Sequence, residues 1–283
     1  MTDIKTVGVV GSGIMGAGLA EVAARSEFNV VVRSRTQAGA DSVLARIDKG
    51  LTKQVSRDRL SEEDRVSILG RISVTDDLNQ LAECDLVIES VIEDMDIKRE
   101  LFAQLDRIIQ PDAILATNTS TLAVVDLAVA TERTDKVCGI HFFNPAPMMK
   151  LVEVIAPITA SEETISAALK FAGDCGKDAV QVEDRAGFIV NALLFPYLNN
   201  AVRMWEQGTA SMDDIDTAMQ GGCNFPMGPF ALLDLVGLDT SLAILDALHD
   251  EFRDPNYAAA PVLRRMVAAG HLGRKTKQGF RSY

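Results

Sequence analysis

An apolar run leads into a glycine turn in the stretch Lys5-Thr6-Val7-Gly8-Val9-Val10-Gly11-Ser12-Gly13-Ile14-Met15-Gly16. The run predicts a strand, and the residues after the turn predict a helix. Gly11 permits the turn, Gly13 lets the backbone approach a pyrophosphate, and Gly16 lets the helix pack against the strand. The helix N-terminus offers free N–H groups to phosphates. We therefore predict a dinucleotide site, with an ordinary glycine-rich turn as the alternative, formed by Gly11, Ser12, Gly13, Ile14, Met15 and Gly16.

The second predicted strand, residues 28–32, runs into Arg33-Ser34-Arg35-Thr36. A site for NAD usually places Asp or Glu here, about 20 residues after the glycines, to bind the ribose 2′-hydroxyl. No acidic residue occurs between Phe28 and Asp41. Guanidinium and hydroxyl groups instead suit a 2′-phosphate. We predict that Arg33, Ser34 and Arg35 favour NADP(H), with NAD(H) also possible. The alternative is that both arginines are solvated loop residues.

Strand and helix patterns then alternate as far as residue 155. Further strands are predicted at 71–75, 85–89, 113–116, 137–141 and 151–155, and helices at 37–54, 61–69, 94–109 and 124–130. Such alternation predicts an α/β fold with a doubly wound, mostly parallel sheet of the Rossmann type. Right-handed crossovers bring the carboxyl ends of parallel strands to one edge, where ligands bind.

The pattern becomes helical near residue 184. Helices are predicted at 188–206, 211–219, 230–236, 240–252 and 261–269. We predict a dinucleotide-binding domain at 1–184 and an all-α C-terminal domain at 185–283. Its broad apolar faces, as in residues 192–198, suit packing between helices or against another subunit.

The composition is that of a soluble globular chain. Of 283 residues, 47% are hydrophobic and 24% are charged, and the net charge is −12. That charge argues against nucleic acid or an anionic membrane surface as a partner. The four scattered cysteines form no CxxC pair, so a reduced, cytoplasmic protein without a metal site is expected. Because a strand begins almost at the N-terminus, no signal peptide is expected, and because no long apolar run occurs, no membrane span is expected.

A histidine and a glutamate mark the chemistry. His141 ends the predicted strand 137–141, at the edge where a parallel sheet presents ligands. Histidine is the usual general base for an alcohol proton at neutral pH. Glu153, in Leu151-Val152-Glu153-Val154, could orient the imidazole and stabilise the imidazolium. The alternatives are a structural histidine and an edge-strand glutamate that faces solvent.

With these motifs the chain resembles the 3-hydroxyacyl-CoA dehydrogenase family, and most closely its bacterial 3-hydroxybutyryl-CoA dehydrogenases. The resemblance covers nearly the whole chain. It is carried, in order, by the glycine loop, Asn118-Thr119-Ser120-Thr121, His141-Phe142-Phe143-Asn144-Pro145, Leu151-Val152-Glu153-Val154, Gly187-Phe188-Ile189-Val190-Asn191, Pro226-Met227-Gly228-Pro229 and Gly273-Arg274-Lys275-Thr276.

The resemblance implies an oxidoreductase that interconverts 3-hydroxyacyl-CoA and 3-ketoacyl-CoA, with His141 as the catalytic acid/base and Glu153 as its partner. It implies that Ser120 binds the substrate C3 oxygen and that Asn191 binds and polarises the substrate. Cofactor-contacting positions are matched by Glu93, Lys98, Asn144 and Lys275, and candidates for CoA contacts are Lys53 and Arg57. The resemblance also implies that the C-terminal domain at 185–283 binds substrate and forms a homodimer.

Several alternatives remain open. A related hydroxy acid or an acyl chain on a carrier protein could be the substrate, and a catalytically silent dinucleotide-binding regulator is a different class. Ser120 could also cap the helix predicted at 124–130. This chain departs from the family at Ser34, where an acid is usual, and in the tail, where Lys277 and Arg281 replace the usual Gly and Tyr.

Overall fold

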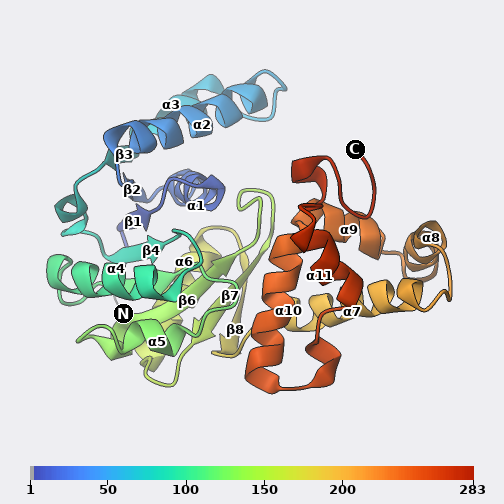
Figure 1. Cartoon of the computed structure of the whole chain (residues 1–283). Helices are drawn as coiled ribbons and strands as arrows, with labels where there is room; N and C mark the ends of the chain where they lie inside the picture. The colour runs from blue at the N-terminus through green and yellow to red at the C-terminus, as the bar shows by residue number, and fades with distance from the viewer. Residues whose placement is uncertain (1–2) are drawn as a thin grey trace. The chain divides into compact units, whose positions relative to one another are not determined.

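The computed structural model describes residues 3–283, and the chain divides after Asp184 into two compact units (Figure 1). The first unit contains one eight-stranded sheet in the order β3-β2-β1-β4-β5-β6-β7-β8. Its strands are β1 (Thr6–Val10), β2 (Asn29–Arg33), β3 (Ile72–Thr75), β4 (Leu86–Glu89), β5 (Ile114–Thr117), β6 (Val137–Phe142), β7 (Leu151–Ala156) and β8 (Asp178–Glu183). All neighbouring pairs are parallel except β6 and β7. The predicted doubly wound, mostly parallel sheet is therefore confirmed.

The helices of this unit lie on both faces of the sheet. They are α1 (Ile14–Arg25), α2 (Gln37–Val55), α3 (Glu62–Gly70), α4 (Met95–Ile108), α5 (Val124–Ala128) and α6 (Glu162–Asp174), with 3₁₀ turns at Leu78–Leu81 and Thr134–Lys136. Figure 1 shows α4 and α5 on one face and α6 on the other. Side chains of α1, α2 and α6 share a buried apolar core with alternate residues of the strands, such as Leu86 and Ile88 of β4. Because side chains alternate along a strand, Val87 and Glu89 point to the opposite face.

The sequence patterns do not predict α6 or β8. β8 is one of the two edge strands, and none of its six residues is buried. Charged residues stand at both of its ends, Asp178 and Glu183, as expected of an edge that faces solvent. This strand lacks the continuous apolar run that marks the central strands, so its signal in the sequence is weak.

The second unit is helical. It contains α7 (Val190–Glu206), α8 (Met212–Cys223), α9 (Pro229–Val236), α10 (Leu238–Phe252) and α11 (Pro261–Ala268), with 3₁₀ turns at Pro255–Tyr257 and Arg274–Thr276. Its core includes Phe195, Leu198, Phe230, Leu245 and Phe280. The predicted all-α C-terminal region is confirmed.

The structure accounts for Arg281 and shows the backbone conformation that Lys277 adopts. Lys277 has a φ of 59°, in the left-handed region that glycine adopts most readily. Arg281 pairs with Asp213 and with Asp216, and its Nη2 lies 3.0 Å from Asp216 Oδ2. The lysine therefore accepts a strained backbone where relatives tend to have glycine, and the arginine ties the tail to α8 by charge.

No helix within residues 3–283 is long and apolar enough to cross a bilayer. Among the same residues, no group of three or more His, Cys, Asp or Glu side chains is arranged to hold a metal ion.

Candidate active site

The glycine loop joins β1 to α1 at the point where the strand order reverses, between β1 and β4. Gly11 has a φ of +136°, and a Cβ there would lie 2.2 Å from the Ser90 carbonyl oxygen. A Cβ on Gly16 would lie 2.1 Å from the Gly11 oxygen. A Cβ on Gly13 would meet nothing within 4 Å, so the space above this residue is open. Gly13 caps α1 with no side-chain hydrogen bond, which leaves the helix N–H groups to a ligand. The loop fits the pyrophosphate of a dinucleotide.

The end of β2 carries the residues predicted to bind a 2′-phosphate. Ser34 is buried, Arg33 is half-buried and Arg35 is exposed. Arg33 Nε donates to the Asp76 carbonyl oxygen at 3.3 Å. The carboxylate of Asp77 is also close enough to Arg33 for an electrostatic interaction, although the lowered pKa of Asp77 comes mainly from the Asn79 N–H. The region therefore presents one exposed guanidinium and one that neighbours an acid.

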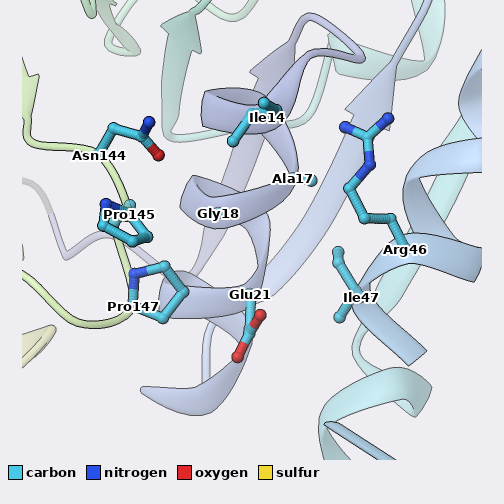
Figure 2. Close-up of a pocket in the computed structure, with 10 residues that line it drawn as sticks. Ile14, Ala17, Gly18, Glu21, Arg46, Ile47, Asn144, Pro145 and Pro147 are labelled. Carbon is cyan, nitrogen blue, oxygen red and sulfur yellow. The ribbon is translucent and has the colours of Figure 1, made fainter. Parts of the chain in front are cut away.

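A pocket of about 180 Å³ lies beside the glycine loop (Figure 2). One face of α1 lines it, through Ile14, Ala17, Gly18 and Glu21, with α2 residues Arg46 and Ile47 on one side and residues 144–147 on the other. Arg46 Nη1 donates to the Ser12 carbonyl oxygen at 3.3 Å. The sequence motifs do not identify Arg46. The sequence offers little signal for it, because Arg46 is exposed and only adjoins Ile47, which belongs to the buried face of α2.

Two predicted CoA contacts lie farther along α2. Lys53 is exposed in its last turn, and Arg57 is exposed in the turn that follows the helix. Within residues 3–283, neither side chain donates a hydrogen bond to another side chain.

His141 and Glu153 form a direct pair. They occupy opposite positions on the antiparallel strands β6 and β7. His141 Nδ1 lies 2.8 Å from Glu153 Oε2, and the glutamate is fully buried. A carboxylate only accepts hydrogen bonds, so Nδ1 carries the proton, and in the neutral ring Nε2 is an acceptor. Glu153 does not face solvent on an edge strand, because β8 covers β7.

Ser120 completes a hydrogen-bonded line, since its Oγ lies 3.0 Å from His141 Nε2. Ser120 does not cap α5. Asp184 takes that role, because its carboxylate accepts from the backbone N–H groups of Val124 and Val125 at 2.9 and 2.7 Å. The expectation that Ser120 could serve as an N-cap is therefore wrong: the helix starts too far along the chain, with Ala123 at its N-cap position.

Glu93 and Lys98 lie together beside the Ser120 loop. Lys98 is fully buried, and its Nζ lies 3.0 Å from Glu93 Oε2 and 3.0 Å from Glu89 Oε2. Burial alone raises the pKa of Glu93, but the Lys98 ammonium and bonds from Thr119 and Ser120 outweigh it and leave the pKa below its usual value. The sequence motifs do not identify Glu89, although an acid that ends a fully buried strand is a signal of a paired charge.

The other predicted residues lie apart from this cluster in the chain. Asn144 is exposed on the loop after β6 and lines the pocket of Figure 2. In the second unit, Asn191 is buried in the first turn of α7. Lys275 lies in the last 3₁₀ turn, where its Nζ is 2.5 Å from each carboxylate oxygen of Asp239.

Known proteins resemble the chain over its whole length. The family model described as 3-hydroxyacyl-CoA dehydrogenase, NAD binding domain, matches residues 6–185, and that of the C-terminal domain matches residues 187–283. A 3-hydroxybutyryl-CoA dehydrogenase of Clostridioides difficile is 46% identical over 275 residues, which are 97% of this chain and 98% of that protein. One of Mycobacterium tuberculosis is 46% identical over 286 residues and covers all of both chains. The crystal structure of (S)-3-hydroxybutyryl-CoA dehydrogenase from Ralstonia eutropha matches with a TM-score of 0.97, 40% identity and 99% coverage of each chain.

Proposed function

The chain belongs to the 3-hydroxyacyl-CoA dehydrogenase family, and on that premise we propose that it interconverts 3-hydroxybutyryl-CoA and acetoacetyl-CoA with a preference for NADP(H). The observation that carries the activity is the line of hydrogen bonds from Ser120 through His141 to Glu153. It provides a base whose acceptor nitrogen, Nε2, faces the hydroxyl that is proposed to bind the reacting oxygen.

The proton chemistry follows from this geometry. In oxidation, His141 Nε2 removes the proton of the C3 hydroxyl; in reduction, the same nitrogen returns a proton to the C3 oxygen. Glu153 accepts from Nδ1, so it holds the ring in one tautomer and stabilises the imidazolium. Ser120 Oγ donates to the C3 oxygen and stabilises the charge that develops there. Asn191 is proposed to bind the substrate from the helical unit.

The nicotinamide cofactor supplies the hydride acceptor or donor when it is bound. The open space above Gly13 and the uncapped start of α1 support pyrophosphate binding at this loop. Further cofactor contacts are proposed for Glu93, Lys98, Asn144 and Lys275. Lys98 is fully buried between two carboxylates, so we propose that its part is to hold Glu93 in place.

The preference for NADP(H) is supported by the residues after β2. The acid expected for a ribose 2′-hydroxyl is absent there, and Ser34 takes its position between two arginines. Arg35 is exposed and positively charged, as required to receive a 2′-phosphate. The description of the matching family model names NAD, so NAD(H) is the reference cofactor against which this preference is measured.

A matched kinetic comparison tests both parts of the proposal. Purified protein is assayed with acetoacetyl-CoA and either NADPH or NADH over a range of concentrations. Turnover with either cofactor supports the dehydrogenase activity, and a higher kcat/KM for NADPH supports the preference. A clear advantage of NADH contradicts the preference alone. No oxidation of either cofactor favours the silent regulator instead.

A different substrate on the same fold is the second candidate. The His141–Glu153 pair can serve any secondary alcohol, so the site itself does not select the CoA thioester. Comparison of acetoacetyl-CoA with its N-acetylcysteamine thioester separates the two, because an enzyme that uses the nucleotide arm loses much of its rate without it. Lys53 and Arg57, both exposed cations on or after α2, are the proposed contacts of that arm.

We also propose a cytoplasmic homodimer that forms through the helical unit. Exposed apolar side chains there, Leu193, Met204, Phe225 and Leu235, support an interface. Light scattering of the purified protein measures the mass of the assembly, and a monomer at micromolar concentration contradicts the proposal.

A further inference from the structure

A buried charge network lies on the face of the sheet that α4 covers. Glu89 ends β4, and Lys98 lies in the first turns of α4. Both side chains are fully buried. Burial of a charged pair costs free energy, and apolar residues of the same volume often stabilise a protein as well or better. Stability therefore does not explain why this pair is buried, and its contacts indicate a different role.

The Glu89 carboxylate joins three segments of the chain. Its Oε1 accepts from the Val91 N–H at 2.5 Å, in the turn after β4. Its Oε2 accepts from Thr117 Oγ1 at 2.7 Å, on β5, and from Lys98 Nζ at 3.0 Å, on α4. The glutamate thus fixes the position of the lysine ammonium relative to two strands.

Lys98 is linked through Glu93 to the loop after β5. Lys98 Nζ lies 3.0 Å from Glu93 Oε2. The other oxygen of Glu93 accepts from the Ser120 N–H at 3.0 Å and from the Thr119 hydroxyl. The Ser120 hydroxyl in turn lies 3.0 Å from His141 Nε2. A continuous path of hydrogen bonds therefore runs from Glu89 to the catalytic histidine.

We propose that Glu89 is a positioning residue of the dehydrogenase reaction, which acts through Lys98 and Glu93 to hold Ser120 against His141. The inference rests on the proposed function. Lys98 Nζ lies 3.0 Å from an oxygen of each carboxylate, so the attraction of both glutamates sets its position. Loss of the Glu89 charge lets the ammonium move toward Glu93 and changes how that carboxylate holds the Ser120 backbone, because charge-assisted bonds are about twice as strong as neutral ones.

A double-mutant cycle tests the proposal. Glu89→Gln keeps the volume and an acceptor but removes the charge. We expect kcat for acetoacetyl-CoA reduction to fall about 10-fold, with KM changed much less. If Glu89 acts through Ser120, the variant that combines Glu89→Gln with Ser120→Ala is no slower than Ser120→Ala alone, within about twofold.

Two results would contradict the proposed role of Glu89. An unchanged kcat in Glu89→Gln, or losses that multiply in the combined variant, assign Glu89 a purely structural role and overturn the proposal. Wild-type protein that does not reduce acetoacetyl-CoA with either cofactor overturns the proposed function as well. An active wild type with multiplying losses overturns only the role of Glu89.

Two further variants guard against trivial effects. Thr117→Val removes one donor to Glu89 without a change of buried charge, and we expect a smaller loss of kcat in the same non-additive pattern, even if Glu89→Gln folds poorly. Asp106→Asn is the control. Asp106 accepts from Arg133 Nε at 2.6 Å and from the Glu132 N–H at 2.8 Å, and it lies in the last turn of α4, whereas Lys98 lies near the start of that helix. We expect a lower Tm with unchanged kcat.

Discussion

His141 and Glu153 stand directly opposite each other on antiparallel strands, with Nδ1 of the ring 2.8 Å from a carboxylate that is wholly shielded from water. The pairing depends on strand direction. β6 and β7 are the antiparallel pair of the sheet. Because β7 runs in the opposite direction to β6, Glu153 near its start lies beside His141 near the end of β6. The acid/base unit is therefore built by a single antiparallel pair in a parallel sheet.

Substitution of the histidine tests the proton transfer itself. We expect His141→Gln to lower kcat by about 10²- to 10⁴-fold, because the variant has no group that can take the alcohol proton at neutral pH. The fold is expected to persist, so circular dichroism and Tm serve as controls. Near-normal turnover would show that another group is the base.

Substitution of the glutamate tests tautomer control. Glu153→Gln keeps the shape but offers an amide that can also donate to Nδ1, which places the ring proton on Nε2, the wrong nitrogen. We expect kcat to fall by about 10²- to 10⁴-fold, as when the carboxylate of a catalytic triad becomes an amide. Steady-state kinetics measure the loss. An effect confined to KM argues against this role.

The cofactor preference has its own test. Arg35→Gln should lower kcat/KM for NADPH by about 10- to 100-fold, because a bond to a charged group contributes about 1.5–3 kcal/mol. The value for NADH should hardly change, since NADH has no 2′-phosphate. Arg59→Gln, another exposed arginine of the same unit, is the matched control. Equal losses for both cofactors in Arg35→Gln contradict the assignment.

The cysteines should differ sharply in reactivity. Burial raises the pKa of Cys84, Cys138 and Cys175 to about 12, because the thiolate is disfavoured away from water. At pH 8 only about one in 10⁴ of these thiols is ionised. Cys223 is exposed. We expect a thiol reagent such as dithionitrobenzoate to modify one cysteine per native chain and four after unfolding. Cys223→Ser should abolish the fast reaction.

Lys177 should hold the loop that lines the pocket. Its Nζ donates to the carbonyl oxygens of Ala146 and Met149 at 2.7 and 2.8 Å. Lys177→Met should lower the free energy of unfolding by about 1–2 kcal/mol, because two carbonyls lose a charged donor. Lys170→Met is the control, since the pair that Lys170 forms with Asp174 is exposed and should contribute little to stability. Urea denaturation measures both.

The sequence alone predicts much of this molecule. The central strands are continuous apolar runs, because both faces of a parallel sheet are buried, and such runs are legible without a structure. Glycines at 11, 13 and 16 predict the loop because the turn, the approach of a pyrophosphate and the packing of the helix leave no room for side chains. Gly16, for example, lies close to the Gly11 carbonyl. The α6 helix and the edge strand β8 are not predicted. For β8 the reason is that the strand is half-exposed and has no buried apolar run.

Contacts across the chain are a different matter. That Glu153 lies opposite His141 depends on the register of β6 and β7, and that Asp184 rather than Ser120 caps α5 depends on a residue 60 positions away. The roles of Glu89 and Arg46 follow from their contacts. Glu89 accepts a hydrogen bond from Lys98, and Arg46 donates one to the Ser12 carbonyl oxygen. The sequence by itself determined the elements and the residue types that chemistry needs, because these obey local rules of burial and backbone conformation. Only the tertiary structure decided which charges meet, because hydrogen bonds form between atoms that folding brings together from distant parts of the chain.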